Sequence, residues 1–296
     1  MSIGINLHTK HGLETYAQGM CNSSGDKAQI NQDIKPGTIL ELGCGNGAYL
    51  QTLPDDRLKE TTAVDMSAAL LLKAQENLGE RAGLVTFKRA NMLRDGFTGL
   101  FNETFDNIVL CSVLHELYSE LRTQELVAKN DEFQAEYNAN KQLKFVFDNI
   151  WNLLSVGGRL IIRDGCKAQG ERVTIKFKNP ETRYAFAKFV DDHPWFISYS
   201  EHDYSVTLNM QDAYEFMTKY FYTENWDIEV LERFGWCDYQ GIVNILSNSQ
   251  FSRKQFKTIR NKPYLIEWLA NKWNQDIELD KPLPASTMIV VLEKIS

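Results

Sequence analysis

The amino-acid sequence predicts an α/β fold with a mostly parallel sheet, and three observations lead to this prediction. Between residues 38 and 163, short apolar runs alternate with segments of helical periodicity. Such alternation is typical of a sheet covered by helices on both faces. The first apolar run, residues 39–42, leads into a turn with a glycine at every second position. With 296 residues, 43% of them hydrophobic, the chain is long enough for one large domain around such a core.

The turn after the first strand has the pattern of a nucleotide-type cofactor site. Its sequence is Glu41-Leu42-Gly43-Cys44-Gly45-Asn46-Gly47-Ala48. Glycine has no Cβ and tolerates positive φ, so the backbone can turn sharply here and let a ligand lie against the peptide planes. The glycine spacing alone does not identify the cofactor, because Gly43-x-Gly45-x-x-Ala48 also fits the dinucleotide pattern. In that pattern, a pyrophosphate lies at the start of the next helix.

Glu41, two residues before the first glycine, favours a cofactor with a positive charge. A carboxylate at the end of the strand repels a pyrophosphate but can hold a cationic amine, directly or through a water. At this point the sequence resembles class I S-adenosylmethionine-dependent methyltransferases, whose first motif is an acidic residue followed by Gly-x-Gly-x-Gly. The resemblance implies S-adenosylmethionine as cofactor, bound around Glu41, Gly43, Cys44, Gly45, Asn46 and Gly47.

The second apolar run ends in a carboxylate that is expected to bind the ribose. Asp65 follows the glycines by about twenty residues, the separation at which an acidic side chain meets ribose hydroxyls. Met66 comes next and is expected at the same part of the cofactor. Asp65 could instead cap the helix expected over residues 68–78, but Ser67 can supply that cap and leave the carboxylate to the ligand.

The third strand leads to residues that are expected around the adenine. The resemblance implies an acidic residue that accepts a hydrogen bond from the adenine amino group, whereas this chain has Asn91. The amide oxygen of asparagine can accept the same bond without charge assistance. Met92 is expected to pack on the adenine face, with Leu93 beside it.

The fourth strand leads toward the methyl group. Residues 104–116 resemble the family's fourth motif, and the resemblance places Cys111 and Ser112 beside the cofactor. His115 follows and is the candidate general base, because an imidazole titrates near neutral pH and a hydroxyl acceptor must lose a proton. The alternative is that His115 and Glu116 only cap and orient the next helix.

Further residues are expected near the acceptor. Methyl transfer is an in-line displacement, so much of the rate enhancement comes from aligning the acceptor, the methyl carbon and the sulfur. The candidate contacts lie after the fourth strand, at the end of the fifth, and in a downstream segment: they are Glu116, Tyr118, Arg163, Asp164, His193 and Trp195.

The remaining segments are expected to complete and cover the sheet. Residues 1–36 are expected to form an N-terminal helical cap that places Tyr16 on the cofactor, and residues 37–296 to form the methyltransferase domain. A helical, aromatic-rich insertion at about 166–248 would cover the substrate. Residues 283–294 resemble the family's last, antiparallel strand, with 251–259 as its partner and a helix over 263–273 between them. This predicts a doubly wound, mostly parallel, seven-stranded sheet.

The composition of the chain disfavours several other classes of protein. A formal net charge of −7 disfavours nonspecific nucleic-acid binding, and the basic clusters within 172–188 and 253–262 are interpreted as solvated faces. Five cysteines without a Cys-x-x-Cys pair argue against a disulfide framework and a zinc ribbon. His8 and His11 have no third ligand nearby, so no metal is expected. No transmembrane run or signal peptide is visible, so we expect a cytoplasmic location.

The sequence therefore predicts a methyltransferase that acts on a small or medium-sized organic acceptor. Methylation of RNA or protein is the nearest alternative; the charge balance disfavours RNA, and no Asn-Pro-Pro-Tyr type motif follows the fourth strand. An NAD-dependent oxidoreductase and a noncatalytic binding module are alternatives from other classes. The expected partner is a small-molecule substrate, without nucleic acid or membrane, and a homodimer is left open.

Overall fold

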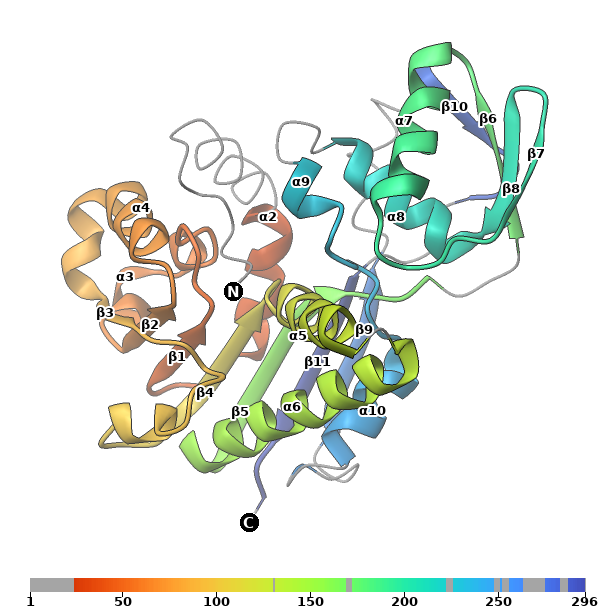
Figure 1. Ribbon diagram of the computed structural model, residues 1–296. Helices are drawn as coiled ribbons and strands as arrows, with labels where there is room; N and C mark the ends of the chain where they lie inside the picture. Colours follow the sequence, from red (N-terminus) through yellow and green to blue (C-terminus); the bar gives the residue numbers. More distant parts are fainter. Residues whose placement is uncertain are drawn as a thin grey trace.

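The centre of the molecule is a sheet with strand order β3-β2-β1-β4-β5-β11-β9 (Figure 1). A computed structural model describes residues 24–129, 131–168, 172–221, 226–247, 251, 256–262, 275–282 and 287–295. The strands of this sheet are β1 (Ile39–Leu42), β2 (Thr61–Asp65), β3 (Thr86–Arg89), β4 (Phe105–Cys111), β5 (Leu154–Gly165), β9 (Phe256–Lys262) and β11 (Thr287–Glu293). Strands β1 to β5 pair in parallel, whereas β11 runs antiparallel to β5 and β9. The predicted doubly wound, mostly parallel fold with an antiparallel last strand is confirmed.

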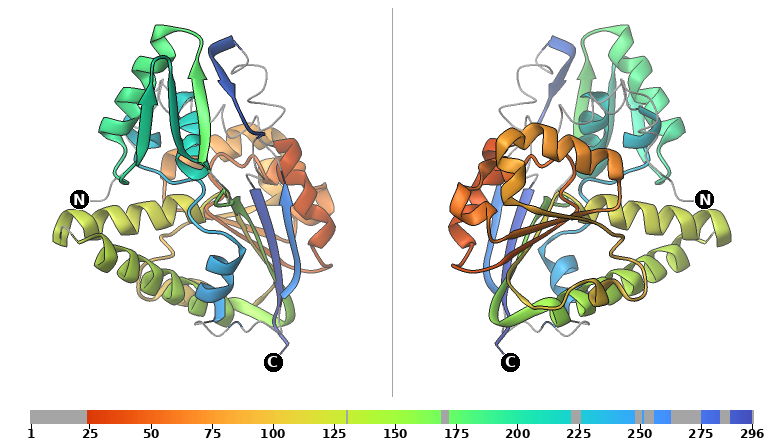
Figure 2. Two further views of the ribbon diagram at one scale, coloured as in Figure 1. Left: turned by 90° about the vertical axis from the view of Figure 1, so that its right-hand side faces the viewer. Right: turned by 90° about the vertical axis from the view of Figure 1, so that its left-hand side faces the viewer.

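Helices cover both faces of this sheet, which explains its continuous apolar strands. Leu40 and Ile108 belong to one core with α5 (Leu114–Lys129), α6 (Glu132–Leu153) and α10 (Tyr239–Ser247). Ile39 and Val109 face the other way, toward α3 (Asp55–Leu58), α4 (Ala68–Leu78) and the short 3-10 helices. Figure 2 shows α4 and the α5–α6 pair on opposite sides of the sheet. The 3-10 helices are η1 (Ala28–Asp33), η2 (Leu50–Thr52), η3 (Gly79–Leu84) and η4 (Phe97–Leu100).

The segment after β5 forms a second lobe with its own sheet and core. It contains β6 (Arg172–Phe177), α7 (Pro180–Asp192), β7 (Tyr199–His202), β8 (Ser205–Asn209), α8 (Met210–Phe221) and α9 (Trp226–Glu229). A later strand, β10 (Ile277–Leu279), completes an antiparallel sheet of order β10-β6-β8-β7. Figure 1 shows this lobe beyond the carboxyl ends of β4 and β5.

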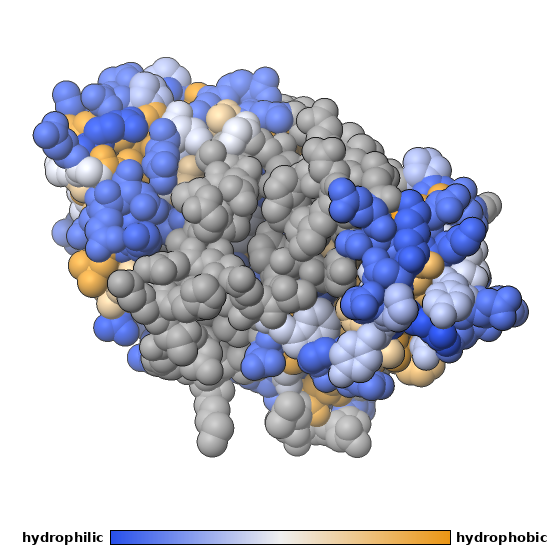
Figure 3. All heavy atoms as spheres, turned by 90° about the horizontal axis from the view of Figure 1, so that it is seen from above, coloured by the Kyte–Doolittle hydropathy of each residue, from blue (hydrophilic) through white to orange (hydrophobic). Residues whose placement is uncertain are grey.

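This lobe corrects the expectation of an all-helical insertion. The insertion contains the helices α7, α8, α9 and α10, but three strands within 172–209 were missed. In β6, the buried side chains of Val173, Ile175 and Phe177 alternate with exposed Arg172 and Lys176, which is the period of a half-buried strand. The exposure of these basic side chains agrees with the interpretation as a solvated face, and Figure 3 shows mostly hydrophilic residues on the described parts of this side.

Several expectations concern residues outside the described ranges. Tyr16 and the first part of the N-terminal cap lie within 1–23, and the helix expected over 263–273 also lies outside them. The second part of the cap forms α2 (Ser24–Lys27) and η1, which buries Ile30 in the core on the α4 side. Across the described residues, no helix has both the length and the apolar character needed to span a bilayer.

Candidate active site

The turn after β1 is held in shape by close packing against protein atoms. Gly43, Gly45 and Gly47 have φ values of +74°, +52° and +76°, a region that favours glycine. A Cβ on Gly43 would lie 2.5 Å from Cγ2 of Val113, and one on Gly47 would lie 3.1 Å from Cβ of Ala74. These glycines therefore let the loop after β4 and helix α4 approach the turn, in addition to the ligand contact expected from the sequence.

Asp65 joins the ends of β1 and β2 at this turn. Its carboxylate accepts hydrogen bonds from the backbone N–H of Gly45 (2.9 Å) and of Ser67 (2.8 Å). Burial raises the pKa of Asp65, although these backbone donors act in the opposite direction. Ser67 caps α4 by accepting from the N–H of Leu70 (3.2 Å), as predicted. Since a carboxylate offers about four lone-pair positions, Asp65 retains capacity for ribose hydroxyls.

Glu41 is a buried carboxyl group that lacks a full set of partners. It is 1% exposed, and its Oε2 atom has no hydrogen-bond partner among the described residues. Burial raises its pKa to about 8, and the nearby Lys27 ammonium opposes this shift. A buried oxygen without a partner costs free energy, so the site is suited to a ligand that brings a hydrogen-bond donor or a positive charge. The α-ammonium of S-adenosylmethionine is such a group.

The other expected cofactor residues have local structural roles as well. Asn46 is buried, with its Oδ1 accepting from the N–H of Ala48 (3.2 Å), and the Oδ1 of Asn91 accepts from the N–H of Leu93 (2.9 Å). Both amides therefore shape turns at the carboxyl edge of the sheet. Met92 and Leu93 are half-buried against the core, Met66 is 47% exposed, and Cys44 is buried.

His115 lies in the first turn of α5, where Asp164 orients it. Nδ1 of His115 lies 2.6 Å from Oδ1 of Asp164, and Oδ2 of Asp164 accepts from the N–H of Leu114 (2.7 Å). The carboxylate thus caps α5 and favours the tautomer with hydrogen on Nδ1, which leaves Nε2 able to take a proton. Burial alone would lower the pKa of His115, but the Asp164 carboxylate outweighs it and raises this pKa.

The loop before His115 also brings β4 and β5 together. Ser112 has a φ of +61°, which is unusual for a residue other than glycine, and its N–H donates to the Arg163 carbonyl (2.7 Å). Arg163 in turn donates from its guanidinium to Oγ of Ser112. Cys111 is buried beside this loop, and burial raises the pKa of its thiol to about 11, so the thiol is protonated at neutral pH.

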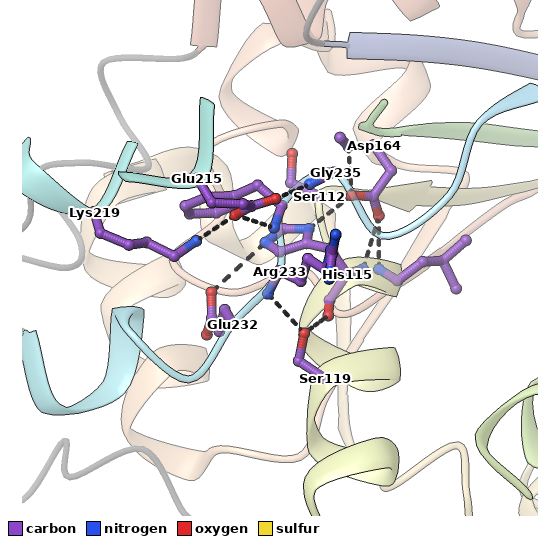
Figure 4. A network of polar contacts seen from close by, with 12 residues as sticks. Ser112, His115, Ser119, Asp164, Glu215, Lys219, Glu232, Arg233 and Gly235 are labelled. Carbon is purple, nitrogen blue, oxygen red and sulfur yellow. Dashed lines mark hydrogen bonds and ion pairs between the residues drawn. The ribbon is translucent and has the colours of Figure 1, made fainter. Parts of the chain in front are cut away.

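Nε2 of His115 faces a group of acidic side chains that sequence reasoning missed in part. Oε2 of Glu232 lies 3.8 Å from Nε2 (Figure 4). Among the described residues, one group of side chains could hold a metal ion: a ligand atom of His115, one of Glu116 and one of Glu232 lie within 4.8 Å of one another. Burial raises the pKa of Glu229 to about 7 and that of Glu232 well above its usual value.

The loop that carries Glu232 is anchored to both α8 and α5. Glu215 accepts from Nζ of Lys219 (2.9 Å) and from the backbone N–H of Phe234 (3.1 Å) and Gly235 (2.9 Å). Ser119 donates to the His115 carbonyl (2.6 Å) and accepts from the N–H of Arg233 (2.9 Å), as Figure 4 shows. Residues 230–238, which belong to the insertion that was expected to be helical, therefore form a loop at His115. No spacing in the sequence marks this contact.

Tyr118 and His193, two of the expected acceptor residues, lie in packed interior positions. Tyr118 packs on Trp236 and hydrogen-bonds Glu136, and burial raises its pKa. His193 lies in the insertion, where Nδ1 is 2.6 Å from the Val230 carbonyl. Burial lowers the pKa of His193 to about 4, so this imidazole is neutral near pH 7.

Trp195 and Asp164 likewise have their principal contacts within the protein. The guanidinium carbons of Arg122 and Arg233 lie 4.7 and 5.7 Å from the centre of the Trp195 ring. Asp164 is fully buried behind His115. The structure thus brings His115, Glu116 and Asp164 together, and it surrounds Tyr118, His193 and Trp195 with side chains of the core and the insertion.

Comparisons with known proteins agree with the fold. A family model described as "Methyltransferase domain" matches residues 40–160, from β1 through the glycine turn and Asp65 to β5. A search of the curated proteins finds no match to the sequence.

Among solved structures, the chain is similar to human N-acetylserotonin methyltransferase in complex with SAM, with a TM-score of 0.53 and 11% identity. That alignment covers 100% of this chain, which spans 60% of the length of the human chain. N-methyltransferase NodS from Bradyrhizobium japonicum WM9 gives a TM-score of 0.46 and 12% identity, covering 94% of this chain and 96% of that chain. CcbJ methyltransferase from Streptomyces caelestis gives 0.49 and 11%, covering 92% and 95%.

The glycine turn, the buried carboxylates at strand ends, the strand order and the matched family model together define the class. Residues 40–160 carry a methyltransferase domain, in a sheet whose last strand is antiparallel.

Proposed function

We propose that this enzyme methylates a small or medium-sized organic acceptor and that His115 takes the acceptor's proton. The observation that carries the proposal is the His115–Asp164 pair at the carboxyl ends of β4 and β5, with a Nδ1–Oδ1 distance of 2.6 Å. It lies at the same edge of the sheet as Glu41 and Asp65, the edge at which open α/β sheets bind ligands.

In this proposal, residues at different strand ends bind different parts of the donor molecule. Glu41 holds the ammonium group and Asp65 the ribose hydroxyls. Asn91, Met92 and Leu93 surround the adenine, and the backbone of the glycine turn approaches the nucleoside. The loop that follows β4 packs directly on Gly43 through Val113, so its residues would border the methyl group of the bound donor.

The chain's own groups supply alignment and proton transfer. Bound S-adenosylmethionine supplies an electrophilic methyl group, whose bond to sulfur breaks as the acceptor's lone pair attacks. Nε2 of His115 accepts the acceptor's proton, and the Asp164 carboxylate stabilises the imidazolium that forms. Glu116 and Glu232 lie close enough to Nε2 to position the acceptor group in front of it.

The test is methyl transfer from tritiated S-adenosylmethionine to the small-molecule, RNA and protein fractions of a cell extract. We expect label in the small-molecule fraction, with the rate strongly reduced in His115→Ala. Label confined to RNA or protein would replace the proposed acceptor class. Binding of the donor without label in any fraction would favour a noncatalytic binding module.

A further inference from the structure

We infer that Glu215, in helix α8 of the second lobe, is a positioning residue for His115. It holds the loop of residues 232–235 so that Phe234 packs against the imidazole and Glu232 lies in front of Nε2. The inference rests on the proposed role of His115 as the general base. Since the family model ends at residue 160, part of the geometry of the base is assigned to a lobe outside the matched residues.

Glu215 is a fully buried carboxylate that accepts hydrogen bonds from four donors. Oε2 accepts from Nζ of Lys219 (2.9 Å) and from the N–H of Phe234 (3.1 Å), as Figure 4 shows. Oε1 accepts from the N–H of Gly235 (2.9 Å) and from Nε2 of Gln211. Burial alone would raise the pKa of Glu215, but nearby cations, chiefly Lys219, outweigh it and lower this pKa. A carboxylate offers about four lone-pair positions, so Glu215 spends its full capacity on fixing the loop.

The side chain of Phe234 connects this loop to His115. The centre of its ring lies 4.8 Å from that of the imidazole, with an angle of 46° between the two planes. Nζ of Lys219 lies 3.8 Å from the centre of the same phenyl ring, within the range of a cation–π interaction. Nδ1 of His115 is bonded to Asp164. The imidazole is therefore held by one contact from the central sheet and by another from the second lobe.

Gly165 allows the loop to lie against the end of β5. It directly follows Asp164, and a Cβ on Gly165 would lie 1.8 Å from the carbonyl oxygen of Phe234. Because this oxygen belongs to the backbone, no side-chain rotation could relieve the clash. A single methyl group at residue 165 would thus move the loop away from His115 and leave the contacts within α8 intact.

The first experiment removes the contacts of Glu215 without leaving a buried ion alone. The double variant Glu215→Gln/Lys219→Met replaces both members of the buried pair with neutral side chains of similar size, since removal of one partner would strand the other charge. We expect methyl transfer from S-adenosylmethionine to the small-molecule fraction of a cell extract to become about ten- to hundredfold slower, because small displacements of a reacting group have effects of this size. The Kd for S-adenosylhomocysteine, measured by calorimetry, should stay the same.

Nuclear magnetic resonance tests the position of His115 independently of turnover. The chain has five histidines, so the imidazole signals of His115 can be assigned by their loss in His115→Ala. We expect these signals to move in the double variant, because the phenyl ring no longer lies at the same place beside the imidazole. Gly165→Ala should change the signals and the rate in the same way. Arg183→Met/Glu201→Gln, which neutralises an exposed ion pair of the same lobe, should change neither.

Unchanged His115 signals and an unchanged rate in the double variant and in Gly165→Ala would overturn the inference, since Glu215 would then only stabilise α8. A loss of donor affinity as large as the loss of rate would overturn it as well, because the change would not be confined to the base. If the double variant does not fold, Gly165→Ala decides between these results. A wild-type protein that methylates no small molecule would instead contradict the proposed function, while the signals of His115 would still test the role of Glu215.

Discussion

The cofactor part and the acceptor part of this enzyme differ in how the chain assembles them. The proposed cofactor residues Glu41, Asp65 and Asn91 occur within one stretch of the chain, each at or just after the end of a successive parallel strand. In the acceptor part, His115 meets Asp164, 49 residues away, and Glu232 from the second lobe. The first part follows local motifs, whereas the second depends on how a separate lobe docks onto the sheet.

This difference separates a part built around one local turn from a part built by contacts between distant elements. The glycine turn packs closely on Val113 and Ala74. The loop that carries Glu232 is set by Glu215 and Ser119, which belong to other elements. Substrate choice is therefore expected to depend on contacts of the second lobe. Substitutions in the two parts should have separable effects on donor binding and on turnover.

The largest expected effect is on turnover in His115→Ala. General base catalysis contributes about a hundred- to ten-thousandfold, so kcat should fall by this factor while the Kd for S-adenosylhomocysteine stays the same. Asp164→Asn should have a comparable effect, because the amide cannot favour the same tautomer. His202→Ala, on the exposed strand β7, serves as the control with unchanged kcat. A normal rate across pH in His115→Ala would assign His115 a structural role.

A smaller effect is expected on donor affinity in Asp65→Ala. Loss of the ribose contact should weaken S-adenosylhomocysteine binding by about 1 to 3 kcal/mol, with kcat at saturation less affected. Because Asp65 also holds the N–H of Gly45 and Ser67, calorimetry should include an analogue without the 2′-hydroxyl. This analogue should lose less affinity on the substitution than the natural ligand. Equal losses would mean that Asp65 acts only on the turn.

The second lobe should become less stable in acid because of His193. At pH 7 this imidazole is neutral in both the folded and the unfolded chain. Below its usual pKa of 6.5 the unfolded chain binds a proton, but the folded chain, with a pKa of about 4, does not. The free energy of unfolding should therefore fall by about 1 to 2 kcal/mol between pH 7 and 5. Denaturant titrations should show a shallower fall in His193→Gln, whereas His202→Gln should match the wild-type protein.

The smallest expected effect is the release of a proton from Glu41 when the donor binds. Its pKa of about 8 means that most of this carboxyl is protonated at pH 7. A bound ammonium favours the ionised form, so donor binding should release up to about one proton. Calorimetry in buffers of different ionisation enthalpy measures this number. Glu41→Gln should release none, and a release that persists in this variant would point to another group.

The fold and the local geometry of the turn after β1 could be predicted from the sequence because their signals are local. The glycine turn, Asp65 at a strand end and the cap at Ser67 each depend on neighbours within a few residues. The alternation in β6 was also readable, since Val173 and Ile175 are two residues apart. The clustering of Glu229 and Glu232 at His115 could not be predicted, because it depends on a loop placed by Glu215.

The turn after β1 is expected to bind a sulfonium nucleoside and not a dinucleotide. Thermal unfolding of the purified protein with S-adenosylmethionine, S-adenosylhomocysteine or NAD tests this most directly, because a ligand stabilises only the state that binds it. We expect a concentration-dependent rise in Tm with the first two ligands and none with NAD. A rise with NAD alone would contradict it.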